Sequence, residues 1–141
     1  MYYLLPLILS LGFYSAPQSI SVEVESTSPG GKVYIGVFDT PEGFAEEKAL
    51  VDAMADLGKA NKHAELTIKL PKEGDYVFAA FQDLNGNGEL DRNMLGVPKE
   101  PFGFSKVMPS KWQSPSFDEV ASPVGGSNDR VTITIKHWKE Y

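Results

Sequence analysis

Alternating apolar and polar positions recur along the chain and predict β-strands. In "SISVEVES", Ile20, Val22 and Val24 alternate with polar residues, which is the pattern of a strand with one buried face. "RVTITIKHW" near the C-terminus has the same period. With "KVYIGVFD", "AELTIKL" and "YVFAAFQD", the predicted strands are five, at residues 19–26, 32–39, 64–70, 76–83 and 130–138.

Two parts of the chain depart from simple alternation. Within 32–39, Tyr34 and Phe38 lie opposite the alternating valine and isoleucine residues, so we expect apolar cover on both faces of this strand. Between Glu46 and Leu57, apolar residues recur at helical spacing. This spacing predicts a short helix or an irregular crossover.

Five strands separated by turns, with little helix, predict an all-β fold, an antiparallel β-sandwich. The segment from Asp83 to about Pro115 is rich in Gly and Pro and has no sustained period, so we expect one long loop. Its aromatic residues, Phe102, Phe104 and Trp112, argue that this loop is ordered.

Length and charge narrow the function classes. The chain has 141 residues, which fits one domain, and 42% of them are apolar, enough for a core. The formal charge is −6 and no basic cluster occurs, which argues against nucleic acid as a partner and predicts repulsion of anionic lipid heads. The absence of cysteine excludes disulfides and thiolate metal sites.

The N-terminal stretch "MYYLLPLILSLGFYSAPQS" carries no charged side chain before Glu23. Its apolar block is too short to cross a bilayer as a helix and is typical of a secretory signal. We therefore expect a signal peptide at 1–16 and one β-sandwich domain at 17–141, secreted or periplasmic, with no membrane span in the mature chain. The alternative is a buried N-terminal strand or helix.

The stretch "DLNGNGELD" sets oxygen-bearing side chains at alternate positions, as in a calcium loop. Asp83 and Asp91 would supply charge, and Asn85 and Asn87 neutral oxygens. Glu89 would bind calcium through its backbone carbonyl. Gly88 stands at the sixth position, where such a loop must bend sharply.

The pattern is not that of an EF-hand. The twelfth position is Met94, where an EF-hand has a bidentate Glu, and the flanks are a strand and a loop. The ligand that completes a strand-anchored site would come from elsewhere, with Glu100 and Asp39 as candidates. The alternative is a metal-free polar turn, because two Asn-Gly pairs favour turns.

Other candidate chemistry is weaker. His63 and His137 have no partner at a metal-binding spacing, and Ser105 lacks the Gly-x-Ser-x-Gly context of a nucleophile elbow. We therefore expect no enzyme activity. Phe102, Phe104 and Trp112 form a candidate platform for a sugar, lipid or peptide; alternatively, these aromatics fold the long loop onto the sandwich as a satellite core.

The segment "GDYVFAAFQDLNGNGELDRNMLGVPKEPFGFS", residues 74–105, resembles the signature of the DUF2141 family, small secreted bacterial proteins of unassigned function. "VYIGVFDTPEGF" and "SPSFDEVA" are also similar to family segments, and the likeness extends over about 20–136. The resemblance implies a secreted β-sandwich and no known activity. Its Gly-x-Tyr start to the strand is similar to that of transthyretin-like and carboxypeptidase-regulatory-like sandwiches.

Together these features predict an exported, non-enzymatic β-sandwich of immunoglobulin/transthyretin-like type with a calcium-binding loop. The alternative function is a ligand-binding module that uses the aromatic residues of the long loop. The partner indicated in either case is an envelope or extracellular ligand.

Overall fold

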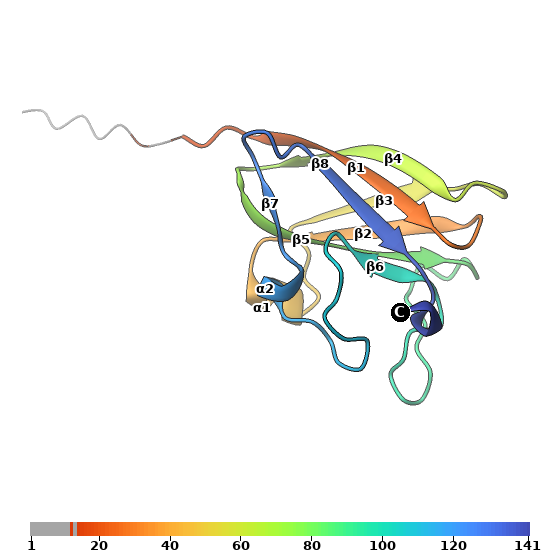
Figure 1. The fold of residues 1–141 in the computed structure, drawn as a ribbon. Helices are drawn as coiled ribbons and strands as arrows, with labels where there is room; N and C mark the ends of the chain where they lie inside the picture. Colours follow the sequence, from red (N-terminus) through yellow and green to blue (C-terminus); the bar gives the residue numbers. More distant parts are fainter. Residues whose placement is uncertain (1–11, 13) are drawn as a thin grey trace, which may run out of the picture.

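The computed structural model describes residues 12 and 14–141, and within them the chain forms two β-sheets (Figure 1). One sheet has three strands, in the order β4 (His63–Leu70), β1 (Gln18–Ser26) and β8 (Arg130–Ile135). The other has the order β3 (Val51–Asp56), β2 (Lys32–Phe38), β5 (Gly74–Asp83) and β6 (Phe102–Phe104), while β7 (Ser122–Val124) pairs with the start of β5. Three short helices are α1 (Pro41–Ala45), α2 (Phe117–Val120) and the 3₁₀ helix η1 (Trp138–Glu140).

The mostly-β prediction is confirmed, and each of the five predicted strands is present. All strand pairs are antiparallel except β1 with β8, which is parallel. The predicted signal segment lies mostly outside the described residues. Among the described residues, no helix is long and apolar enough to cross a membrane.

The main core lies between the two sheets and follows directly from the alternation. Ile20, Val22 and Val24 of β1 and Val33 and Ile35 of β2 are all buried in one apolar cluster that draws on both sheets. Burial of such side chains contributes about 1.5–3 kcal/mol each. The polar residues between them face outward.

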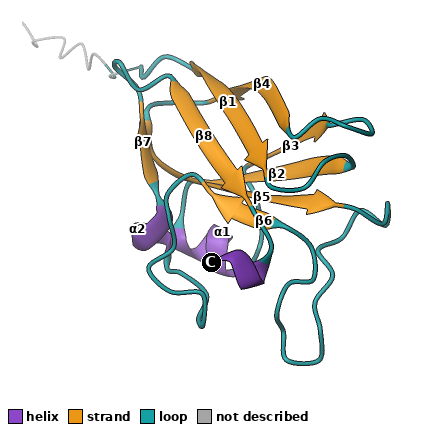
Figure 2. Cartoon of the chain, turned by 45° about the vertical axis from the view of Figure 1, so that its right-hand side comes forward, coloured by secondary structure: helices purple, strands orange, loops and turns teal. Residues whose placement is uncertain are grey.

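A second apolar cluster covers part of the opposite face of the five-stranded sheet, called here the outer face. Phe38 and Val77 on this face pack with Phe117 and Val120 of α2. Phe44 of α1 adds an edge-to-face ring contact, with its centroid 5.3 Å from that of Phe38. The expectation of apolar cover on both faces of β2 is therefore confirmed, and the two helices provide it (Figure 2).

The predicted helix or crossover between residues 46 and 57 is wrong, because this segment forms strand β3. Val51, Ala53 and Ala55 are half-buried on the core side, and their neighbours are exposed. Pairing with β2 supplies the backbone hydrogen bonds and decides the conformation of so short a run. The helical spacing arose from Leu50 and Met54, whose side chains are partly exposed.

Helix α1 follows β2 directly and is one short helical segment of five residues. Thr40 caps it, since Thr40 Oγ1 accepts a hydrogen bond from the Gly43 N–H at 3.0 Å, and Pro41 occupies the first turn without needing a donor.

The predicted single loop after Asp83 is divided by β6, which joins the two sheets at one corner. The Phe102 N–H donates to the Lys136 carbonyl at 3.0 Å, and the Lys136 N–H donates back at 3.1 Å. Gly103 allows this close approach, because a Cβ there would lie 2.0 Å from the Thr134 carbonyl oxygen. The rest of the segment forms a hairpin at 91–99 and an irregular stretch at 106–115.

Candidate functional site

The 83–91 loop closes around the carboxylate of Asp83, which is buried at the end of β5. Oδ1 accepts the Gly86 N–H and Oδ2 accepts the Gly88 N–H, both at 2.8 Å. Removal from water raises the pKa of Asp83, but backbone N–H groups lower it by more, so the pKa lies below its usual value. The donors are those of Gly88, Gly86, Asn87 and Asn85.

Asp91 closes the other side of the loop. Asn87 Nδ2 donates to both carboxylate oxygens of Asp91 at 3.0 Å, and Asn85 Nδ2 donates to the same carboxylate. The oxygen of Asn85 accepts the Asn87 N–H at 3.2 Å, and the oxygen of Asn87 accepts the Glu89 N–H at 3.0 Å. The four side chains predicted as ligands thus belong to one small hydrogen-bonded loop, in which Glu89 takes part through its backbone N–H.

Glu100 and Asp39, the candidates for a completing ligand, differ in position. Glu100 is buried beneath the loop, where Oε1 accepts the Leu84 N–H at 3.0 Å and Oε2 accepts the Asp91 N–H at 3.2 Å. Asp39 follows β2 at the end away from Asp83 and lies outside this site. Glu100 therefore braces both ends of the loop, a role that the pattern of acids alone did not indicate.

The loop offers few charges to a cation. Within residues 12 and 14–141, no three His, Cys, Asp or Glu side chains gather as a metal-binding group. The asparagine amides also direct their nitrogens toward Asp91. A bound cation would have to be held by two carboxylates together with amide and backbone oxygens, after both asparagines had turned.

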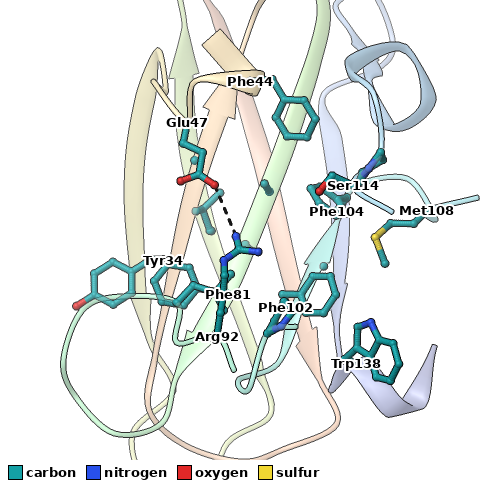
Figure 3. Close-up of a pocket in the computed structure, with 18 of the residues that line it drawn as sticks. Tyr34, Phe44, Glu47, Phe81, Arg92, Phe102, Phe104, Met108, Ser114 and Trp138 are labelled. Carbon is teal, nitrogen blue, oxygen red and sulfur yellow. Dashed lines mark ion pairs between the residues drawn. The ribbon is translucent and has the colours of Figure 1, made fainter. Parts of the chain in front are cut away.

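The three aromatic candidates, Phe102, Phe104 and Trp112, line one groove on the outer face of the five-stranded sheet. Figure 3 shows Phe102 and Phe104 among the side chains of this groove. This outer groove is open and has a volume of about 1080 Å³. Its floor is made by side chains of β2, β5 and β6, and its walls by α1, the 91–99 hairpin, the 106–115 stretch and η1.

The strand register arranges the floor in two rows. Tyr34, Phe81 and Phe102 form one row, and the rings of Tyr34 and Phe81 stack with centroids 5.3 Å apart. Gly36 and Ala79 are paired in the neighbouring row. Because they have no side chain or only a methyl group, the floor is lower there. A ridge of flat rings thus lies beside a depression.

Charged and aromatic side chains stand over this floor. Arg92 forms a 3.6 Å ion pair with Glu47 on one side of the outer groove (Figure 3). On the other side Trp112 meets Trp138 edge to face, with centroids 5.0 Å apart, and Lys111 Nζ lies 4.5 Å from the Trp138 ring centre. Trp112 is nevertheless 78% exposed.

The comparison with family models decides the family. The model described as "Uncharacterized protein conserved in bacteria (DUF2141)" matches residues 22–132. The chain belongs to the DUF2141 family. The matched part of this DUF2141 chain runs from β1 into β8 and contains the 83–91 loop and most of the outer groove. Comparison with curated proteins gave no significant match, and neither did comparison with solved structures.

The aromatic residues of the DUF2141 chain divide between the two predicted roles. Phe104 packs edge to face on Phe44, with centroids 6.0 Å apart, and Phe117 is buried, as a satellite core requires. Trp112 contacts Trp138 at its edge but is not buried, and it fits the role of a binding platform better. Sequence reasoning missed Trp138 and the Tyr34–Phe81 stack, although both strand aromatics stand on the face opposite the core in the alternation.

The remaining candidates in the DUF2141 chain lie apart from the outer groove. His63 is exposed at the start of β4, and Ser105 Oγ lies 3.0 Å from Ser122 Oγ. His137 Nε2 lies 3.2 Å from Ser28 Oγ, but the Glu140 carboxylate accepts the His137 backbone N–H instead of orienting the ring. This serine–histidine pair thus lacks the acid of a triad among the described residues.

Proposed function

We propose that this DUF2141 protein is an exported, non-enzymatic binding protein whose outer groove takes a saccharide. In this proposal the two sheets form an immunoglobulin/transthyretin-like β-sandwich that serves as a rigid scaffold, in the periplasm or outside the cell. The observation that carries it is the exposed Trp112 beside Trp138, at the edge of a groove floored by aromatic rings.

The shape and chemistry of the groove favour a saccharide. A pyranose ring has an apolar C–H face, which stacks on aromatic rings such as the stacked pair Tyr34 and Phe81. Its hydroxyl groups both donate and accept hydrogen bonds. The Glu47–Arg92 pair, with side chains 80% and 46% exposed, offers an acceptor and a donor without a net charge.

Intrinsic fluorescence tests the proposal directly, because the chain has two tryptophans and both line the outer groove. The probes are maltohexaose, cellohexaose and chitohexaose, titrated into the protein. We expect a saturable change in emission with at least one of them. Phe81→Ala should weaken that affinity roughly tenfold, as truncation of a central aromatic contact does.

Met54→Ala is the matched control, since Met54 lies on the same face, beside Tyr34, but outside the groove lining. Its affinity should equal that of the native protein. If no saccharide gives a saturable change, or if Phe81→Ala binds as tightly as the native protein, the saccharide assignment is wrong. If only a short-chain phosphatidylcholine, and none of the saccharides, gives a saturable response, the ligand of the outer groove is a lipid.

We also propose that the 83–91 loop binds calcium. The specific support is the convergence of Asp83, Asn85, Asn87 and Asp91 on one loop that Glu100 holds closed. Calcium would displace the asparagine donors from Asp91 and draw in their oxygens, with the Glu89 carbonyl as a further ligand. With two carboxylates the affinity should be that of extracellular modules, with a Kd on the order of 10⁻⁴–10⁻³ M.

A further inference from the structure

We propose that the protein docks on an anionic phospholipid surface through two segments, 91–99 and 106–115, called here the tip loops. Both extend from the same side of the molecule, beyond the strands, in the two views (Figures 1 and 2). They carry four large apolar side chains that face solvent: Met94 at 104% exposure, Leu95 at 88%, Val107 at 84% and Trp112 at 78%. The tip loops also form two walls of the outer groove and share Leu95 and Trp112 with its lining, but the inference does not require that a saccharide binds there.

The first tip loop holds its apolar pair out rigidly. Asn93 begins a tight turn, since its carbonyl accepts the Gly96 N–H at 2.9 Å. Its side-chain oxygen also accepts the N–H groups of Leu95 and Val97, at 2.9 and 3.0 Å. Met94 and Leu95 therefore occupy the two central positions of a braced turn, where polar residues and glycine are usual. Within the part of the chain that the structure describes, both side chains project almost fully into solvent.

The charge distribution matches an anionic surface. The chain as a whole has 13 Lys and Arg against 19 Asp and Glu, but the tip loops hold four of the cations and one of the acids, Asp91, whose carboxylate accepts hydrogen bonds from Asn85 and Asn87. The overall negative charge predicted repulsion of lipid heads. The tip loops reverse that sign locally, where approach would occur.

Cations and apolar side chains alternate closely within the tip loops. Lys106 precedes Val107, and Lys111 precedes Trp112. Exposed Lys99 and Lys106 form no ion pair with any described residue. Such neighbours suit a membrane interface, where lysine reaches the phosphate layer while the adjacent side chain enters the acyl boundary. Tryptophan prefers the same depth.

The arrangement fits a lipid surface better than a protein partner. A stable protein interface needs a continuous, shape-complementary patch of about 800 Å² on each side. The exposed apolar residues here sit at separated points on two projecting loops, with cations between them. A fluid surface accepts such separate insertions.

Co-sedimentation with large unilamellar vesicles tests this inference. The full chain should bind vesicles of phosphatidylcholine and phosphatidylglycerol at a ratio of about 3:1 better than pure phosphatidylcholine, and added salt should weaken the binding. Met94→Ser with Leu95→Ser should lower the partition coefficient about tenfold or more, because two inserted apolar side chains are lost. Lys106→Glu should weaken binding to the anionic vesicles and leave binding to pure phosphatidylcholine unchanged.

The matched control is Met54→Ser, a partly exposed methionine on β3 away from the tip loops, which should bind like the native protein. Quenching of tryptophan fluorescence by brominated lipid reports insertion at the tip loops. The expected signal segment 1–16 contains no tryptophan, so its insertion would give no signal. With Trp138→Phe, emission then comes from Trp112 alone and should be quenched on anionic vesicles.

Three outcomes would overturn the proposal. The first is equal vesicle binding by the native protein and the Met94→Ser/Leu95→Ser variant, and the second is an unquenched Trp112. The third is a native dimer in analytical ultracentrifugation without lipid that this variant abolishes, which would make the tip loops an interface between copies. Sugar binding by the outer groove is measured without vesicles, so its failure would leave the vesicle result standing and can be told apart from failure of membrane docking.

Discussion

Asp83 stabilises the 83–91 loop only while it is ionised, because its oxygens accept backbone N–H groups and have nothing to donate to. Its pKa lies below the usual value in the folded protein. The free energy of unfolding therefore contains a contribution that is fully present above the usual carboxyl pKa of about 4 and is lost as the pH falls through the lower folded pKa.

Asp83→Asn tests this linkage. The substitution should lower the free energy of unfolding at pH 7, since an amide replaces a carboxylate that accepts two N–H groups. The difference from the native protein should shrink at acid pH, as the pH falls through the lowered pKa of Asp83 and the native carboxyl becomes protonated. Urea unfolding at pH 7 and at acid pH measures it. A difference that stays constant with pH would contradict the assigned role.

At the scale of single residues, the sequence predicted which side chains matter in the 83–91 loop but not how they are used. The alternation of oxygen-bearing residues identified Asp83, Asn85, Asn87 and Asp91. That the asparagines donate to Asp91 depends on how the loop closes, and that Glu100 braces it depends on a contact sixteen residues away. Spacing alone carries neither fact.

At the scale of elements, the 83–91 loop should respond to calcium as a unit. At a calcium concentration about ten times Kd, binding to the folded state alone adds roughly 1.4 kcal/mol. For a domain of this size the melting temperature should rise by about 3–5 °C. Magnesium should have a smaller effect, because it gives up water reluctantly.

Variants separate calcium binding from a mere salt effect. Asp91→Ala should abolish the calcium-dependent rise in melting temperature. Glu89→Gln should keep most of it, because the seventh position binds through its backbone carbonyl. Melting curves in chelator and in millimolar calcium provide the measurement. Equal responses from the native protein and Asp91→Ala would mean that the loop is a polar turn.

Strand β6 depends on the glycine at its centre. Gly103→Ala would place a Cβ 2.0 Å from the Thr134 carbonyl oxygen, and backbone on both sides prevents relief. We expect a loss of roughly 2–3 kcal/mol or more in the free energy of unfolding. Amide exchange at Phe102 and Lys136 should also accelerate, because their mutual hydrogen bonds would part.

Gly36→Ala is the comparison for that prediction. Its Cβ would meet the Phe38 ring at 3.1 Å, a side chain that can shift. It should destabilise the protein less than Gly103→Ala, as urea unfolding of the two variants would establish. The reverse order would show that β6 does not require a glycine.

The elements that could not be predicted from the sequence are those that depend on pairing with neighbouring strands. Long alternating runs such as β1 and β8 can be recognised in the sequence, because burial of one face fixes their period. β6 and β7 have three residues each, too few for any period. β3 alternates, but Leu50 and Met54 imitate a helix, and only pairing with β2 removes the ambiguity.

At the scale of the whole molecule, we predict that the protein is exported and that its N-terminal segment is removed. The apolar N-terminal stretch predicts that a signal peptidase cleaves the chain after residue 12 or 16. N-terminal sequencing of the protein recovered from the periplasm or medium should find one of these two starts. A soluble product that retains Met1 would contradict the prediction, and residues 1–20 fused to a reporter should direct it out of the cytoplasm.

The fold class was predictable because composition and period restrict a chain of this kind to layered β-structure. The strand order was not, because alternation says which face a strand buries and nothing about its neighbour. β1 illustrates this: it lies between β4 and β8, and nothing local marks β8 as its parallel partner. The outer groove likewise arises only where four separate segments meet.

The parallel pairing of β1 with β8 has a kinetic consequence. Among the described strands β1 is synthesised first and β8 last, so one edge of β1 stays unpaired until β8 has emerged. Contacts between such distant segments form slowly, because a long loop must close first. The three-stranded sheet therefore cannot be completed until β8 has been made, which would keep the chain incompletely folded during the export proposed above.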